Sequence, residues 1–136
     1  MKQFVACIIL VIAFLTGCNN NKKLLVKQWD CVKVENLAPV DKHFLSSEDS
    51  LLTVKMETAL QNLSWTFNHD NSYQCSSAGI TTARGIYSIT DNGKQLVCTS
   101  EKNNINRYGI SSLTETELVL QGYTTSAPII MYFRPH

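Results

Sequence analysis

Hydrophobic and polar positions alternate along most of this chain from residue 63 onward. In residues 83–98, Tyr87 and Ile89 share one face of a first arm. A second arm repeats the same spacing with Leu96, after a turn at Asn92-Gly93. Alternation with a period of two is typical of half-buried strands, and Asn-Gly favours the left-handed backbone of a tight turn. The stretch therefore predicts a β-hairpin.

Similar strand patterns recur at short, even spacing, and one precedes residue 63. The predicted strands are residues 24–35, 63–67, 72–77, 83–90, 94–100, 105–113, 117–124 and 127–134. Residues typical of turns join them. A meander of this kind has to close on itself or cover its edges. The pattern predicts an all-β fold, an eight-stranded antiparallel up-and-down barrel.

Residues 46–63 interrupt the alternation and predict one helix between the first two strands. Ser46 and Asp49 form a capping box. Apolar residues at helical spacing share one face, and they are Leu52, Met56, Ala59, Leu60 and Leu63. We expect this face to seal one mouth of the barrel, and a partner-binding helix is the alternative.

Trp29 is the largest apolar residue of the first predicted strand. This strand must pair with the last one to close the meander. We therefore expect Trp29 to be buried at one end of the barrel, against the last strands.

Residues 1–17 have the features of a bacterial export signal. Lys2 gives a positive start, residues 4–15 are uninterrupted apolar, and Leu15-Thr16-Gly17-Cys18 resembles a lipobox. Cleavage before Cys18 leaves a thiol that takes diacylglycerol, with fatty acyl chains such as palmitate. The alternative is a short transmembrane anchor that stays attached, although the apolar run is short for a membrane span. Either way the sequence predicts a membrane tether.

The expected domains are a signal peptide at 1–17, lipidated Cys18 with a flexible tether at 18–23, and a barrel at 24–136. By resemblance to other lipoproteins, Asn19 after the lipidated cysteine favours the outer membrane, facing the periplasm. Loss of Lys2 with the signal leaves eleven basic and eleven acidic residues. A neutral chain does not favour nucleic acid, and no protein partner is indicated.

Three cysteines, Cys31, Cys75 and Cys98, remain after lipidation of Cys18. Cys75 and Cys98 lie on predicted strands with one strand between them, so roughly 9 to 10 Å separates them, which is too far for an undistorted disulfide. We expect buried free thiols, with other pairings left open. Their spacing matches no zinc pattern, so no metal or cofactor is predicted.

No set of residues predicts catalysis. His43, His69 and His136 have no serine or cysteine at a nucleophile spacing. Glu115 and Glu117 fit a solvated turn better than an acid and base pair. Arg84 and Arg107 lie on strands, either pointing outward into solvent or inward to a ligand carboxylate, and the outward placement is expected. The sequence therefore does not predict an enzyme.

Several segments resemble the small bacterial lipocalin-like lipoproteins. The opening Leu25-Val26-Lys27-Gln28-Trp29, the hairpin at 63–73, the run 85–89 and the hairpin at 108–120 are similar to that family. Asn71 stands where the family usually has a turn glycine, and asparagine tolerates the left-handed conformation. The resemblance covers nearly all of the chain after the signal, and it implies a lipid-anchored lipocalin-like barrel.

The inward-facing positions of such a barrel can line a cavity or fill it. The candidate lining residues are Trp65, Phe67, Tyr73, Tyr87, Leu96, Ile110, Leu118, Leu120 and Met131. We expect a small, largely apolar ligand that enters at the end of the barrel not covered by the 46–63 helix. The alternative is a structural or protein-interaction module of the envelope with a filled barrel and no ligand.

Overall fold

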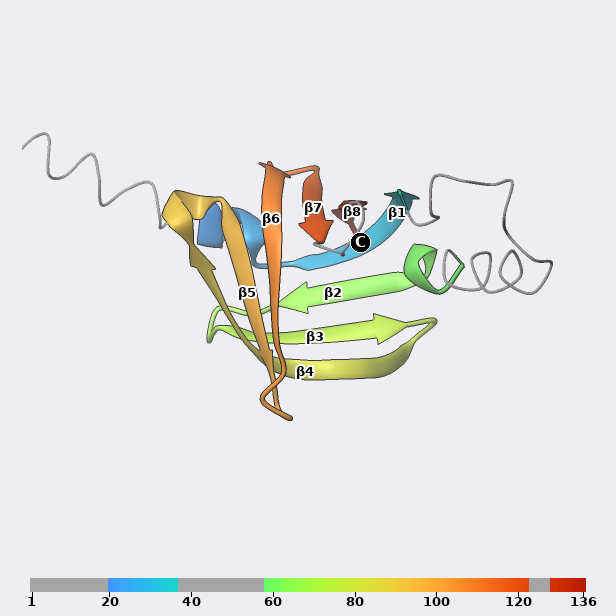
Figure 1. Cartoon of the computed structure of the whole chain (residues 1–136), viewed down its shortest axis with the longest axis horizontal. Helices are drawn as coiled ribbons and strands as arrows, with labels where there is room; N and C mark the ends of the chain where they lie inside the picture. Colours follow the sequence, from blue (N-terminus) through green and yellow to red (C-terminus); the bar gives the residue numbers. More distant parts are fainter. Residues whose placement is uncertain (1–19, 37–57, 123–127) are drawn as a thin grey trace, which may run out of the picture.

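Eight antiparallel strands close into one barrel in chain order (Figure 1). This computed structural model describes residues 20–36, 58–122 and 128–136. The strands are β1 Gln28–Glu35, β2 Leu63–Phe67, β3 Ser72–Ser77, β4 Ile80–Thr90, β5 Gln95–Ser100, β6 Ile105–Leu113, β7 Leu118–Gly122 and β8 Ile129–Pro135. The predicted fold class is confirmed. All eight strands and their closing pair come from residues 20–136, so this segment contains a complete barrel.

The barrel closes where β1 pairs with β8. Trp29 lies opposite Pro135 and Cys31 lies opposite Phe133 in an antiparallel register. Trp29 is fully buried, and its Nε1 donates a hydrogen bond to the Leu25 carbonyl oxygen at 2.9 Å. The prediction that Trp29 is buried near the last strand at one end of the barrel is confirmed.

The hairpin between β4 and β5 turns through the short 3₁₀ helix η1, Asp91–Gly93. Asp91, Asn92 and Gly93 all have positive φ, of 53°, 53° and 85°. Asn71, in the β2–β3 turn, has a φ of 66°, so asparagine does take the left-handed conformation there. Side chains that tolerate positive φ thus set the register of both hairpins.

Strand bounds differ from the prediction at two places. β1 begins at Gln28 rather than residue 24, because residues 20–25 are helical. β4 begins at Ile80 rather than residue 83, because Ala78 and Gly79, both at positive φ, make a two-residue turn. That turn brings Ile80 opposite Ser77 in the ladder.

The helical residues 20–25 differ from the flexible tether predicted at 18–23. The Val26 amide donates to the Lys22 carbonyl at 3.0 Å, and Leu25 is fully buried in the core. Asn21 approaches the η1 turn so closely that a Cβ added to Gly93 would lie 1.9 Å from its Nδ2. Burial of Leu25 supplies the tertiary contact that a polar sequence does not reveal. We call residues 20–25 the N-terminal helical segment.

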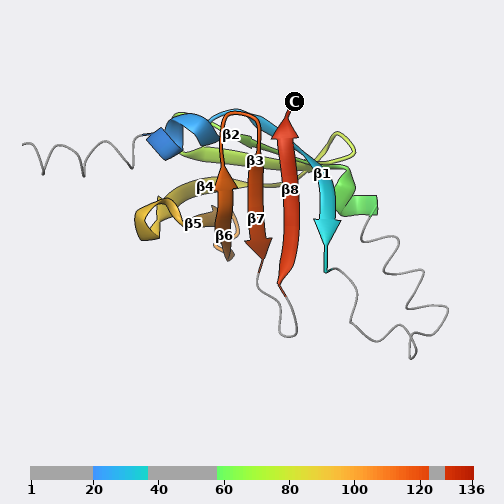
Figure 2. The same cartoon turned by 90° about the horizontal axis from the view of Figure 1, so that it is seen from above.

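The two helical segments lie at opposite ends of the barrel (Figure 2). We call the end with the N-terminal helical segment, η1 and the Thr114–Glu117 turn the closed end; Lys27 Nζ there donates to the Glu115 carbonyl at 3.0 Å. The open end has helical residues 58–61 and the β3–β4 and β5–β6 turns. The predicted helix is helical at 58–61 and ends before Leu63, which begins β2.

Residues 46–57 of that predicted helix lie outside the described residues. The predicted signal peptide at 1–17, Cys18 and Asn19 also lie outside them. Among the described residues, no helix is long and apolar enough to cross a membrane.

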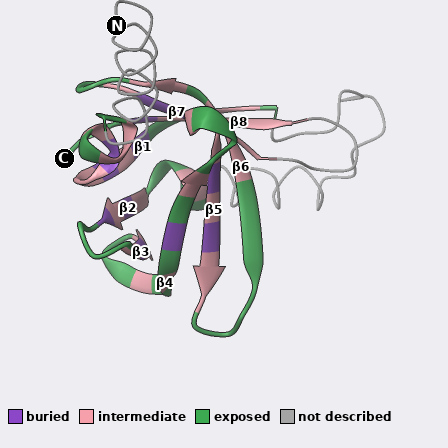
Figure 3. Ribbon diagram, turned by 90° about the vertical axis from the view of Figure 1, so that its left-hand side faces the viewer, coloured by how far each residue is buried: buried purple, intermediate pink, exposed green. Residues whose placement is uncertain are grey.

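Buried side chains alternate with more exposed ones along several strands, and Figure 3 shows this alternation on β5. Among the described residues, eight large side chains are almost completely enclosed, namely Trp29, Phe67, Phe133, Leu25, Leu96, Leu118, Leu120 and Cys98. Cys31, Cys75 and Cys98 are buried free thiols, as the sequence predicts.

Candidate functional site: a cavity at the open end of the barrel

The nine candidate lining residues divide between a packed region and an open one. Six belong to the hydrophobic core or pack against it. Phe67, Tyr87, Leu96, Leu118 and Leu120 are buried core residues, and Ile110 is half-buried and packs against them. Of the nine, Trp65 and Met131 line a cavity at the open end among the described residues, which we call the main cavity, and Tyr73 lines smaller neighbouring pockets. The predicted residues thus lie on the interior face of the barrel, and three of the nine border a cavity or pocket.

The main cavity has a volume of about 780 Å³. Its walls combine large apolar side chains with a polar rim. The lining residues are Leu60, Leu63, Trp65, Cys75, Ile105, Asn106, Arg107, Tyr108, Gly122, Ile129 and Met131. A volume in the range of roughly 300 to 1,000 Å³ with a mostly apolar lining is typical of small-molecule sites.

Trp65 forms the boundary between the cavity and the packed core. Its ring centroid lies 5.6 Å from that of Phe67 and 6.4 Å from that of Phe133, both fully enclosed core residues. Tyr108 meets the same indole edge-on at 5.3 Å, on the cavity side. Aromatic contacts of this kind hold a ring in one orientation. Trp65 therefore provides a fixed floor to the cavity.

The indole nitrogen of Trp65 is buried without a hydrogen-bond acceptor among the described residues. Buried polar groups are nearly always paired, and an unpaired one costs about 1 to 3 kcal/mol. Tyr87, in the packed region, shows the usual outcome, because its hydroxyl donates to the Asn68 carbonyl at 2.8 Å. The unpaired indole nitrogen of Trp65 thus differs from the paired hydroxyl of Tyr87.

Four titratable side chains gather near Trp65. Burial raises the pKa of the Cys75 thiol and of the Tyr73 hydroxyl, and it raises the pKa of Tyr108 far above its usual range. Burial, with a smaller effect of nearby Cys75, raises the pKa of Cys98 to about 12. All four groups are neutral at neutral pH, and the same low-dielectric surroundings disfavour any negative charge.

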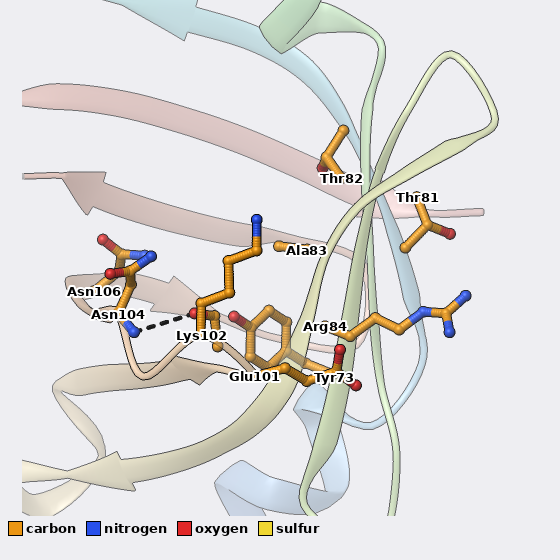
Figure 4. Close-up of a pocket in the computed structure, with 10 residues that line it drawn as sticks. Tyr73, Thr81, Thr82, Ala83, Arg84, Glu101, Lys102, Asn104 and Asn106 are labelled. Carbon is orange, nitrogen blue, oxygen red and sulfur yellow. Dashed lines mark hydrogen bonds between the residues drawn. The ribbon is translucent and has the colours of Figure 1, made fainter.

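A smaller pocket of about 500 Å³ lies beside the main cavity and shares Asn106 with it. Figure 4 shows Asn104, Asn106 and Lys102 on one side, with Ala83 and the neighbouring β4 residues on the other. The backbone amide of Asn104 donates to Ser100 Oγ at 3.2 Å, which orders the β5–β6 turn. This pocket is more polar than the main cavity, and its charged side chains are Arg84, Glu101 and Lys102.

The residues that could suggest catalysis are scattered. His136 Nδ1 lies 2.7 Å from Asp30 Oδ2 at the closed end. Burial raises the pKa of Asp30, but hydrogen bonds from His136, Ser64 and Gln28 outweigh it and hold the pKa below its usual value. His43 lies outside the described residues, and His69 is exposed in the β2–β3 turn. Asp30 and His136 have an evident structural role, which is to fasten the C-terminal residue to β1.

The expected ligand route, at the end opposite the 46–63 helix, stays a prediction, because residues 46–57 lie outside the described residues. Among the described residues, the cavity lies at the end that holds helical residues 58–61, and Leu60 is part of its wall. The opposite end is closed by the N-terminal helical segment and filled by Leu25, Trp29 and Phe67. The helical segment that covers the closed end has no sequence periodicity from which its position could be predicted.

Sequence reasoning missed several wall residues, and a signal for them exists. Inward positions at the open end carry small or polar side chains, namely Cys75, Ala83, Gly122 and Asn106, whereas inward positions at the closed end carry large ones. Residue size along the inward face, compared strand by strand, indicates where space remains. Alternation alone gives no such information.

Comparison with known proteins identifies the fold. No protein-family model and no curated protein matches the sequence. Among solved structures, a lipocalin-like protein from Bacteroides uniformis is similar at a TM-score of 0.53 and 12% identity, covering 83% of this chain and 99% of that one. An uncharacterized protein from Bacteroides eggerthii is similar at 0.52 and 11% identity, covering 82% of this chain and 99% of that one.

A DUF4847 family protein from Bacteroides vulgatus is also similar, with a TM-score of 0.51 and 14% identity. The match covers 82% of this chain and 93% of that one. Identities this low carry information about architecture alone. The protein therefore has the lipocalin-like fold, an eight-stranded antiparallel barrel.

Proposed function

We propose that this protein is a binding protein of the bacterial envelope that takes up a small, largely apolar molecule in its barrel. The observation that carries the proposal is the cavity of about 780 Å³ at the open end, with walls that include Trp65, Leu63 and Met131. Removing apolar surface from water gains roughly 25 cal/mol per Å². Apolar walls therefore favour an apolar ligand without a dedicated charged site.

A lipid anchor at Cys18 is the second part of the proposal. The Leu15-Thr16-Gly17-Cys18 pattern after an apolar run supports it. The anchor places the barrel at the outer membrane, facing the periplasm, and diacylglycerol on the thiol supplies the membrane affinity. Cys18→Ser is expected to release the protein from membranes. A membrane-bound product of unchanged size would replace the lipid anchor with an uncleaved helix.

Gly122 offers a direct test of the cavity. A Cβ at this position meets its nearest neighbours, the Ile129 carbonyl oxygen and Tyr108, at 3.9 and 4.0 Å, so a side chain can be added without backbone movement. Gly122→Phe projects a ring toward the cavity that Gly122 lines, whereas Gly122→Ala leaves most of it open. The two variants form a matched pair.

The experiment is extraction of small molecules from the full-length protein purified from envelopes, followed by mass spectrometry. We expect an apolar compound that accompanies the native protein and Gly122→Ala but is depleted in Gly122→Phe. Titration with the apolar fluorophore dimethylaminonaphthalene is expected to give saturable binding to the native protein and to Gly122→Ala, and weaker binding to Gly122→Phe. No compound and no saturable binding, with the fold intact by circular dichroism, would favour a structural or protein-interaction module.

A further inference from the structure

We propose that the barrel stands with its closed end toward the membrane that anchors it, so that the main cavity opens away from this membrane into the aqueous space. The inference rests on the proposed lipid anchor at Cys18 and deepens the proposed function, because it names the side from which the ligand enters. Two observations carry it. The N-terminal helical segment is fastened to the closed end, and the main cavity lies at the open end.

The N-terminal helical segment and the residues that follow it are held to the closed end by several contacts. Leu25 is fully buried, and its carbonyl oxygen accepts the hydrogen bond from the Trp29 indole at 2.9 Å. The carbonyl oxygen of Lys27 accepts from the Phe67 amide at 3.1 Å, and Lys27 Nζ donates to the Glu115 carbonyl at 3.0 Å. These contacts join this part of the chain to β1, to β2 and to the turn before β7. Buried apolar contacts and hydrogen bonds of this kind oppose local opening, so the segment stays at this end.

The proposed anchor is attached close to the closed end. Cys18 precedes Asn20, where the N-terminal helical segment begins, by two residues. Two residues of fully extended chain span at most about 7 Å. This bound depends on chain length alone, since Cys18 and Asn19 lie outside the described residues. An uncleaved apolar run that ends before Cys18 would leave the membrane at nearly the same point, so either anchor gives the same placement.

The length of the barrel separates the main cavity from this attachment point. β1 runs from the closed end to the open end over eight residues, and the two helical segments mark the two ends in Figure 2. At about 3.3 Å per residue, a strand of this length extends over roughly 25 Å. For the mouth of the cavity to rest on the bilayer, the chain after Cys18 would have to cover that distance, which takes at least about seven extended residues. Two residues are too few, so the mouth is directed away from the bilayer.

Exposed isoleucines at the open end are the strongest argument for the opposite arrangement. Ile80 and Ile105 are 72% and 58% exposed, and both lie where strands begin at this end. However, Ile86 and Val32 are similarly exposed, at 63% and 51%, and they lie within β4 and β1. Single apolar side chains scattered over a surface are ordinary. Their exposure therefore does not select the open end as the surface that contacts the membrane.

This orientation determines how the ligand is exchanged. The closed end, packed with Leu25, Trp29 and Phe67, lies between the anchoring bilayer and the main cavity. A molecule dissolved in that bilayer has no direct path into the cavity. The protein therefore takes up molecules that are dissolved in the aqueous space or delivered from its far side.

Two exposed lysines beyond the two ends of β5 offer a matched pair of labelling sites. Lys94 lies just before β5 at the closed end, and Lys102 lies in the β5–β6 turn at the open end. Lys94→Cys and Lys102→Cys remove the same charge and each adds one exposed thiol. Cys31, Cys75 and Cys98 are buried, and buried thiols react poorly. A thiol-reactive fluorophore therefore marks one chosen end of the barrel in each variant.

The test measures which label lies nearer the membrane. The full-length variants are purified from envelopes, labelled, and reconstituted in vesicles of phosphatidylethanolamine and phosphatidylglycerol, with a nitroxide on the lipid headgroup as a short-range quencher. We expect the label of Lys94→Cys to lose more fluorescence than the label of Lys102→Cys. Equal quenching, or stronger quenching of the label of Lys102→Cys, would overturn this inference while the lipid anchor stands. Vesicles that retain no protein would overturn the anchor as well, and the ligand titrations of the proposed function are independent of both results.

A longer connection between Asn19 and Asn20 is the control for the tether. A flexible Gly/Ser insertion of about twenty residues has an end-to-end distance of roughly 25 Å, which matches the length of the barrel. We expect this insertion to reduce the difference in quenching between the two labels. A difference that persists undiminished would mean that the surface of the domain, and not the short tether, sets the orientation, and it would overturn the inference.

Discussion

The two ends of this barrel are built from the same strands but differ in how completely inward side chains fill the interior. At the closed end, large inward side chains such as Phe67, Leu96 and Leu118 meet in the interior, and Leu25 of the N-terminal helical segment covers them. At the open end, inward positions carry Cys75, Gly122 and other small or polar residues, and space remains.

The two tryptophans, Trp29 and Trp65, differ in hydrogen bonding in the same way as the two ends differ in packing. Where packing is complete, Trp29 is enclosed and its nitrogen is paired. Where packing stops, Trp65 is enclosed, but its nitrogen has no hydrogen-bond partner in the part of the chain that the structure describes. We therefore expect the closed end to contribute most of the stability, and the proposed ligand site lies at the open end.

The largest effect is expected at the closed end, from Trp29→Ala. This change removes a fully buried ring and its hydrogen bond to Leu25. We expect a loss of about 3 to 5 kcal/mol in the free energy of unfolding, measured by urea denaturation. A loss below about 1 kcal/mol would mean that the closed end does not carry the stability we assign to it.

Leu118→Ala and Met131→Ala compare the two ends with similar truncations. Leu118 is fully enclosed, whereas Met131 borders the existing cavity. Truncation to alanine costs about 2 to 5 kcal/mol, and the cost rises with the volume of new, enclosed cavity. We expect Leu118→Ala toward the upper part of that range and Met131→Ala toward the lower part. Equal losses in urea denaturation would remove the distinction between the ends.

Gly93→Ala and Gly79→Ala test the contact of the N-terminal helical segment. Both glycines have positive φ, of 85° and 79°, so each alanine is strained by about 1 to 2 kcal/mol. A Cβ at Gly93 meets Asn21, whereas nothing lies within 4 Å of one at Gly79. We expect Gly93→Ala to be the more destabilising by thermal denaturation. If Gly79→Ala costs as much, Asn21 does not pack on the η1 turn.

The smallest effect is expected from acidification. Burial raises the pKa of Asp30, but hydrogen bonds from His136, Ser64 and Gln28 leave it below its ordinary value of 3.8. The stabilisation is therefore present above that value and is lost as pH falls through the lower folded pKa. The side chains are partly exposed, so solvent screening keeps the change below about 1 kcal/mol. Asp30→Asn is expected to flatten the pH dependence of the urea midpoint between about pH 5 and about pH 2.

The strands and turns could be predicted from the sequence because local patterns encode them. Alternation places Tyr87 and Leu96 on one face, and residues that tolerate positive φ, such as Asn71 and Gly93, mark the hairpin turns. The buried position of Trp29 followed from the need to close the meander. Free thiols followed from the expected separation of Cys75 and Cys98 by one strand.

The closed end and the cavity could not be predicted because they depend on tertiary packing. The N-terminal helical segment has too few residues for a helical period, and its position depends on Leu25 entering the core. Alternation assigns Leu118 and Met131 to the same interior face, although one is enclosed and the other borders space. Side-chain volume decides whether an inward position is packed or borders a cavity, and a pattern of hydrophobic and polar positions carries no information about volume.

The central claim is that the barrel is packed at one end and open to a ligand at the other. The two indole N–H signals of a ¹⁵N-labelled sample of residues 20–136, recorded during titration with dimethylaminonaphthalene and assigned with Trp65→Phe, test it most directly. We predict that the Trp65 signal shifts saturably and that the Trp29 signal stays in place. A Trp65 signal that does not move, or equal shifts of both signals, would contradict the claim.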